Sequence, residues 1–206
     1  MGGLTAVARA QMARGRLTRA EIPAGLVVAI VVVTMILHVA WLVRFRRADI
    51  VEWDEAGYMQ FSLSNYDALR EQGLWTFAKT VAGRETFGPF FPFVVSLAYP
   101  VTGRGVFGGL LVMPLFFVGL VAATYGLARQ LVSSSWAVVA ALAVAAMPAV
   151  IDYSRLFHFA LPATACMTAA LWSLLRTEGL RRPGWAAAFG IFLALTWLSR
   201  TMTVAY

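Results

Sequence analysis

The sequence is poor in charged residues, in acids and in cysteine. Only 13% of its 206 residues are charged, 60% are hydrophobic, and ten are Asp or Glu. Soluble domains carry about one quarter charged residues, so this composition indicates a membrane protein. The single cysteine, Cys166, excludes a disulfide framework within the chain.

Two kinds of sequence signature are also missing. No glycine-rich phosphate loop follows a strand-like segment, and no Cys/His cluster has the spacing of a zinc site. These absences argue against a soluble nucleotide-binding domain in this chain. The net charge of +7 does not indicate a nucleic-acid partner, because the arginines lie at the ends of apolar runs, where they suit lipid headgroups.

Long apolar runs dominate what is present. After a basic arm at 1–23, residues 24–43 are uncharged and would form a helix about 30 Å long, enough to span a bilayer. Further spans are predicted at 106–128, 136–151, 159–175 and 185–198. Residues 89–101 are short for a span, begin with Pro89 and also contain Pro92 and Pro100. The predicted fold class is an all-α, polytopic transmembrane helical bundle.

Residues 44–88 form the long polar stretch and hold seven of the ten acids. Two short helices are predicted there, at 54–70 and 74–82, with Gly73 as the break between them. Their apolar side chains are spaced so that both helices can lie along a membrane surface. We therefore expect amphipathic juxtamembrane helices in this first loop.

The arginines give two possible topologies. The basic arm at 1–23 predicts a cytoplasmic N-terminus in the plasma membrane, which makes 44–88 an extracytoplasmic loop. If 89–101 dips into the membrane and returns, Arg129 becomes cytoplasmic, and the polar turn 152–158 joins the acidic loop outside. If 89–101 crosses fully, both assignments invert. We prefer the returning path.

The C-terminal part, 89–206, is expected to contain the remaining transmembrane helices of the same domain. The sequence stops at Ser199-Arg200-Thr201-Met202-Thr203-Val204-Ala205-Tyr206, without a polar tail. We expect the chain to be the N-terminal portion of a longer membrane protein.

Two adjacent carboxylates, Asp54 and Glu55, begin the predicted helix at 54–70. In a structural interpretation, Asp54 caps the helix and Glu55 interacts with its dipole. In a functional one, a carboxylate at the membrane face is partly desolvated, which raises its pKa and its strength as a base. Tyr58 lies four residues after Asp54 on the same helical face and could hold the carboxylate or a substrate. The spacing leaves both interpretations open.

A basic arm and one span followed by Trp53-Asp54-Glu55-x-x-Tyr58 resembles the polytopic GT-C glycosyltransferases. The most similar group includes the aminoarabinose lipid A transferase and the protein O-mannosyltransferases. Later segments resemble that family in the same order. They are GPFFPF at 88–93, GRGVFG at 103–108, ARQL at 128–131 and YSRLFHFALP at 153–162.

The resemblance implies transfer of a sugar from a polyprenyl-phosphate donor to a lipid, glycan or protein acceptor on the outer side of the membrane. In that family the acid after the first span is the general base or orients the acceptor. Asp54 matches this position, and Glu55 is the second acid of the motif. Where family members often carry an acid before a later proline, this chain has Leu161, and His158 is the nearest polar side chain.

A phosphate leaving group requires cations near the headgroup plane, and arginine suits that task through bidentate contacts. Arg155 and Arg200 interrupt apolar segments, and Arg84 is a third candidate, standing a few residues before the position where some family members carry a Glu-Lys pair. For each, the alternative is an interfacial arginine that reaches lipid phosphates. His158 could assist an acid or bind a metal, so a divalent ion is a possible cofactor.

Two other classes of function compete with the transferase. In a transporter, charges within the membrane mark a path for an ion or solute. Against this, the predicted spans are nearly free of acids, and the polar residues gather in one loop. In a membrane scaffold without enzymatic activity, replacing Asp54 and Glu55 would change stability alone.

Overall fold

The computed structural model describes residues 24–46, 53–83 and 88–200. Within these ranges every regular element is a helix and none is a strand, which confirms the all-α fold class. The helices are α2 (Ala24–Phe45), α3 (Trp53–Asp67), the π-helix η1 (Ala68–Gln72), α4 (Leu74–Ala82), α5 (Phe90–Thr102), α6 (Val106–Leu110), α7 (Met113–Leu131), α8 (Ser134–Ala145), α9 (Pro148–Arg155), α10 (Ala160–Leu175) and α11 (Pro183–Ser199).

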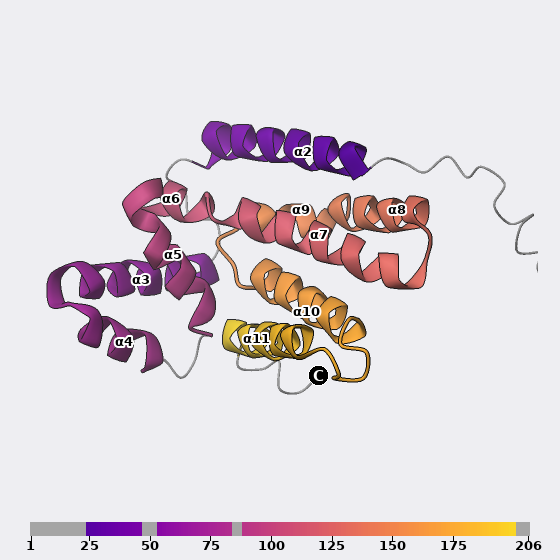
Figure 1. The fold of residues 1–206 in the computed structure, drawn as a ribbon. Helices are drawn as coiled ribbons and strands as arrows, with labels where there is room; N and C mark the ends of the chain where they lie inside the picture. Colours follow the sequence, from indigo (N-terminus) through magenta and orange to yellow (C-terminus); the bar gives the residue numbers. More distant parts are fainter. Residues whose placement is uncertain (1–23, 47–52, 84–87, 201–206) are drawn as a thin grey trace, which may run out of the picture.

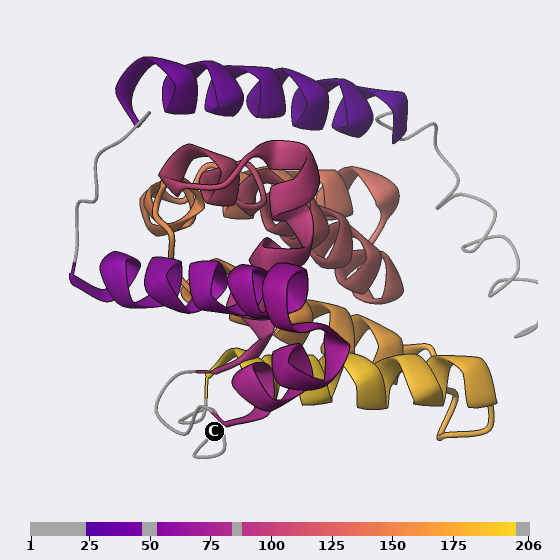
Figure 2. The same cartoon turned by 90° about the vertical axis from the view of Figure 1, so that its left-hand side faces the viewer.

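The longer helices form a bundle with two distinct ends. The N-terminal end of α2, the α7–α8 turn and the α10–α11 turn lie toward the right in Figures 1 and 2. Helices α3 to α6 gather at the opposite end (Figure 1), where α2 ends and α7 begins. Helix α2 therefore ends, and α7 begins, at the same end of the bundle (Figure 1); the returning path of 89–101 stays a prediction.

Several helices have the length and composition of membrane spans. The window Val28–Phe45 in α2 and the stretch Val106–Leu131, which includes α6 and α7, are each apolar and long enough to cross a bilayer. Helices α8 and α9 together form a third such segment, bent by 56°. Helices α5, α10 and α11 are apolar but shorter. The chain is thus a multi-pass membrane protein.

The bend between α8 and α9 has a local cause in the sequence. Met147, which precedes Pro148, has extended backbone angles (φ −63°, ψ 127°), as a residue before proline prefers. Pro148 then starts α9, where its missing N–H costs no helical hydrogen bond. The span predicted at 136–151 is therefore a broken segment rather than one straight helix.

The polar stretch folds as two short helical segments separated at Gly73, whose φ of +86° suits glycine. Helix α3 and η1 occupy most of the first predicted helix, and α4 occupies the second. Trp53 and Trp75 are exposed by 91% and 73%, which suits side chains at a membrane interface. Helix α3 begins at Trp53, so Asp54 lies in its first turn.

Aromatic side chains from α5 and from the turn between α9 and α10 fill the core beneath α3. Phe91, Tyr99 and Phe157 are almost completely buried, and the Phe91 and Phe157 rings lie 4.7 Å apart. Gly109 of α6 packs directly on Phe157, since a Cβ there would lie only 2.4 Å from the ring. This packing fixes the turn at 156–159 against the start of α3.

Candidate functional site

The structure brings Asp54 and His158 together, although they are far apart in sequence. Asp54 lies in the first turn of α3, and its Oδ2 atom is 3.8 Å from His158 Nε2. The Asp54 side chain is 53% exposed and the His158 side chain only 10%. The carboxylate therefore faces the surface, while the imidazole forms the floor beneath it. A separation of 3.8 Å is too long for a direct hydrogen bond.

The backbone orients the imidazole of His158. Its Nδ1 atom accepts a hydrogen bond of 3.1 Å from the backbone N–H of Ala160. Because Nδ1 is the acceptor, the proton of the neutral ring belongs on Nε2, the atom that faces Asp54. The ring also lies 4.2 Å from Phe159 and 5.1 Å from Tyr153, measured between centroids. His158 is thus held as a donor directed toward the carboxylate.

Tyr58 forms the inner wall of this site. Its side chain is 2% exposed, and its ring contacts His158, Phe159 and Phe91 at centroid distances of 6.0, 5.4 and 6.1 Å. Burial raises the pKa of Tyr58 above its ordinary value and the charge of Asp54 raises it further, although Arg200 acts in the opposite direction. Tyr58 therefore stays neutral over the physiological pH range.

The Glu55 side chain points into the protein, away from the surface to which Asp54 is exposed. Its side chain is 2% exposed and pairs with the buried Arg46 at 2.6 Å. The guanidinium Nη2 donates to both carboxylate oxygens, at 2.6 and 2.9 Å. The backbone N–H of Phe157 donates to Oε1 at 2.7 Å. Glu55 therefore ties together the end of α2, the start of α3 and the turn that carries His158.

The predicted phosphate-binding arginines separate in the structure. Arg200 is exposed just after α11, and its guanidinium lies 4.9 Å from the centroid of the Phe159 ring, so it borders the Asp54 site. Arg155 turns toward α2 instead, where its guanidinium stacks 4.4 Å above the Trp41 ring. Arg84 lies outside the described residues.

The part of the chain that the structure describes supplies too few ligands for a metal site. Asp54 and His158 supply two groups of the right chemistry, but no described His, Cys, Asp or Glu joins them to make a group of three. Glu55 is turned away and held by Arg46. These residues do not by themselves fit a bound metal, and we derive no chemical step through one.

Sequence reasoning assigned no site role to Arg46, Phe157 or Phe159. Arg46 lies just beyond the first apolar run, and nothing in its spacing from Glu55 indicates a contact. A usable signal is the scarcity of charge, because an arginine beside an apolar span is expected to find a carboxylate when it is buried. The two aromatic residues give no such signal.

One family matches the chain. The model of the dolichyl-phosphate-mannose-protein mannosyltransferase family matches residues 86–206, more than half of the sequence. These residues include His158 and Arg200, whereas Asp54 and Glu55 precede them. No curated protein and no solved structure matches the chain. The match confirms a resemblance to membrane glycosyltransferases, and the chain belongs to the dolichyl-phosphate-mannose-protein mannosyltransferase family.

Proposed function

We propose that this protein transfers a sugar from a polyprenyl-phosphate donor to an acceptor hydroxyl on the extracytoplasmic side of the plasma membrane. The observation that supports this most is the meeting of Asp54 with His158. An exposed carboxylate from the polar loop faces an oriented imidazole from within the segment that matches the family. The orientation with a cytoplasmic N-terminus belongs to the same proposal.

Asp54 acts as the general base. It accepts the proton of the acceptor hydroxyl as the acceptor oxygen bonds to the anomeric carbon of the sugar. The bond between that carbon and the donor phosphate breaks, and its electron pair stays on the phosphate oxygen. The 3.8 Å gap between Asp54 and His158 allows a hydroxyl to contact both side chains, with His158 Nε2–H as the donor.

Arginine side chains stabilise the departing phosphate. Arg200 borders the site over Phe159 and carries a charge that a phosphate attracts. Arg155 stays a second candidate for the phosphate, because its Nε is buried without a hydrogen-bond partner among the described residues. A role for Arg84 stays a prediction from sequence.

Glu55 acts as a positioning residue in this proposal. It touches neither the surface nor the gap beside Asp54, and both of its oxygens contact Arg46. Its bond to the Phe157 N–H holds the residue next to His158. The second acid of the motif thus sets the distance across which Asp54 and His158 face each other.

The first experiment is sugar transfer by the full-length protein, comparing wild type with Asp54→Asn. The amide keeps the side chain's shape and removes the base, so the rate should fall by about 10²- to 10⁴-fold. Asp152→Asn, an exposed acid on α9, is the matched control and should transfer at the wild-type rate. Both variants should unfold at the wild-type temperature, because neither acid is buried.

Undiminished transfer by Asp54→Asn would remove Asp54 from the chemistry. A transporter is the alternative function, and it would move solute without consuming a sugar linked to polyprenyl phosphate. Absence of transfer by wild type across a panel of donors, with solute uptake retained, would favour it.

A further inference from the structure

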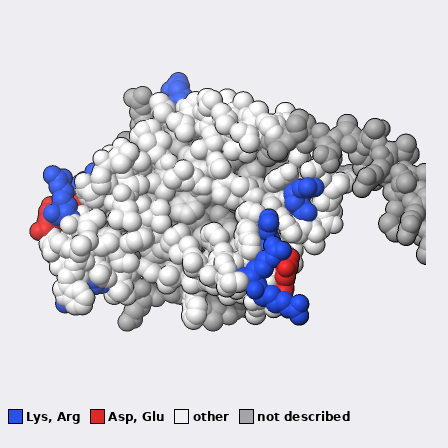
Figure 3. Space-filling view, viewed as in Figure 1, with Lys and Arg blue, Asp and Glu red and all other residues white. Residues whose placement is uncertain are grey.

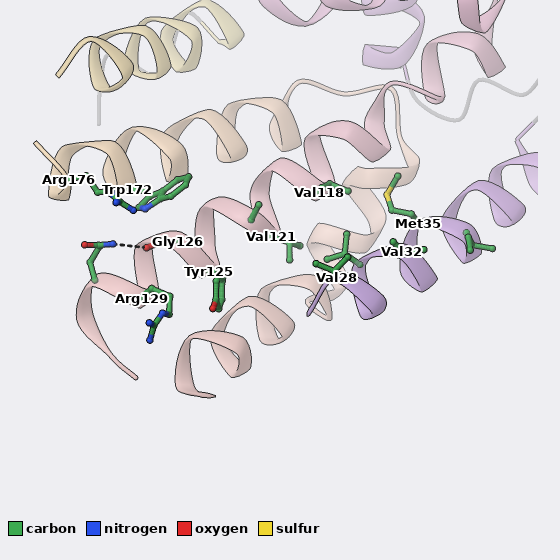
Figure 4. Close-up of a pocket in the computed structure, with 14 residues that line it drawn as sticks. Val28, Val32, Met35, Val118, Val121, Tyr125, Gly126, Arg129, Trp172 and Arg176 are labelled. Atoms are coloured by element: carbon green, nitrogen blue, oxygen red, sulfur yellow. Dashed lines mark hydrogen bonds between the residues drawn. The ribbon is translucent and has the colours of Figure 1, made fainter. Parts of the chain in front are cut away.

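A cavity lies between α2, α7 and α10, away from the Asp54 site (Figure 4). Its volume is about 960 Å³. Aliphatic side chains form most of its walls, with Val28, Val32 and Met35 from α2 facing Val118 and Val121 from α7. Such walls suit a hydrocarbon chain rather than a polar metabolite.

One end of this groove is cationic. Arg129, at the end of α7, and Arg176, at the end of α10, line the cavity together with Trp172 (Figure 4). The Arg176 guanidinium lies 4.5 Å from the centroid of the Trp185 ring, which fixes its direction. Neither arginine pairs with a carboxylate among residues 24–46, 53–83 and 88–200, and Glu178 nearby pairs with Arg182.

The same end carries a buried donor. The indole Nε1 of Trp172 is inaccessible to solvent and has no acceptor within the described residues. A buried N–H without an acceptor is unfavourable, so a ligand oxygen here would be stabilised. Figure 3 shows the wider setting, with Lys and Arg side chains grouped at the right-hand end of the molecule.

The cationic end is on the other side of the bundle from the Asp54 site. Val28 lines the groove near the start of α2, and Phe45 ends that helix next to Arg46, which pairs with Glu55 of α3. The helical rise between Val28 and Phe45 is about 26 Å, close to the thickness of a bilayer's hydrocarbon core. The end of the groove that carries Arg129 is therefore about one hydrocarbon core away from the Asp54 site.

We propose that this groove binds an anionic phospholipid of the leaflet opposite the Asp54 site. Its phosphate lies between Arg129 and Arg176, an oxygen accepts from Trp172 Nε1–H, and an acyl chain follows the apolar walls of α2 and α7. A phospholipid joins an anion to a hydrocarbon chain, so it satisfies both halves of the groove. The proposal is independent of the transfer reaction.

The test is lipid retention by the full-length protein, purified in detergent and titrated with phosphatidylglycerol, with native mass spectrometry as the readout. Arg129→Gln with Arg176→Gln should weaken phosphatidylglycerol binding by at least about tenfold, since two charge-assisted contacts are lost. Arg181→Gln with Arg182→Gln removes equal charge from the same end, outside the groove, and should bind as wild type does.

A second pair of variants tests the apolar part. Ala122→Trp fills the groove and should also reduce phosphatidylglycerol binding. Leu115→Trp places the same side chain on α7 at an exposed position outside the groove and should leave binding unchanged. Equal loss of phosphatidylglycerol binding in the Arg129/Arg176 and Arg181/Arg182 variants would mean that the lipid is attracted by positive charge in general and not by the groove. Absence of bound lipid in wild type, or unchanged binding in the Arg129/Arg176 and Ala122 variants, would overturn the proposal.

Discussion

The buried pair of Glu55 and Arg46 gives a sharp prediction for Glu55→Gln. The two side chains are 2% and 5% exposed and 2.6 Å apart. The amide can still accept from the Phe157 N–H, so the substitution removes the charge while keeping the shape. It leaves the Arg46 charge buried and uncompensated, which costs about 3–5 kcal/mol in the free energy of unfolding.

This loss should be visible as a lower unfolding temperature. For a chain of this size, 1 kcal/mol corresponds to about 2–4 °C, so Glu55→Gln should lower the midpoint by roughly 6–20 °C. The assay is thermal unfolding of purified protein in detergent, followed by tryptophan fluorescence. Asp67→Asn is the control, because the Asp67–Arg104 pair is exposed and contributes little.

A double substitution separates charge from packing. Combining Glu55→Gln with Arg46→Met removes both charges and keeps an acceptor for the Phe157 N–H, so this variant should be more stable than Glu55→Gln because no charge is left buried. The reasoning is refuted if Glu55→Gln shifts the midpoint no more than the Asp67→Asn control. It is also refuted if the double variant is as unstable as Glu55→Gln.

Two further predictions follow from packing and titration. Gly109→Ala should lower the free energy of unfolding by about 1–3 kcal/mol, because its Cβ would lie 2.4 Å from the Phe157 ring. Gly119→Ala on α7 is the control: it has open space around it and should be neutral or stabilising by up to about 1 kcal/mol. If Gly109→Ala and Gly119→Ala changed the thermal unfolding equally, the packing argument would be contradicted. Burial raises the pKa of Tyr58, so the folded protein keeps the phenol proton at a pH where the unfolded chain has lost it. The stabilisation by the neutral, buried phenol is therefore complete below about pH 10, where unfolded tyrosine titrates, and is lost as the pH rises further. Unfolding midpoints from pH 9 to 11 should therefore decline less steeply in Tyr58→Phe, and equal slopes would refute this role of burial.

Local sequence patterns were sufficient for the helices and for the polar loop. An uncharged apolar run such as 24–43 can satisfy its backbone in lipid only as a helix, so composition and length predict α2 directly. Gly73 marked the break between the two loop helices, because its φ of +86° is strained for other residues. The same patterns placed Asp54 at the head of α3.

Only the tertiary structure distinguished the two acids of the motif. Helical periodicity describes neighbours within one segment, whereas Glu55 pairs with Arg46 of the preceding segment and with Phe157, 102 residues further along the chain. The same packing of the turn at 156–159 on α3 brings His158 to within 3.8 Å of Asp54. Sequence alone therefore determined which residues carry charge in an apolar protein. Packing decided that Asp54 faces the surface while Glu55 is buried, because the partners of Glu55, Arg46 and Phe157, lie on other segments of the chain.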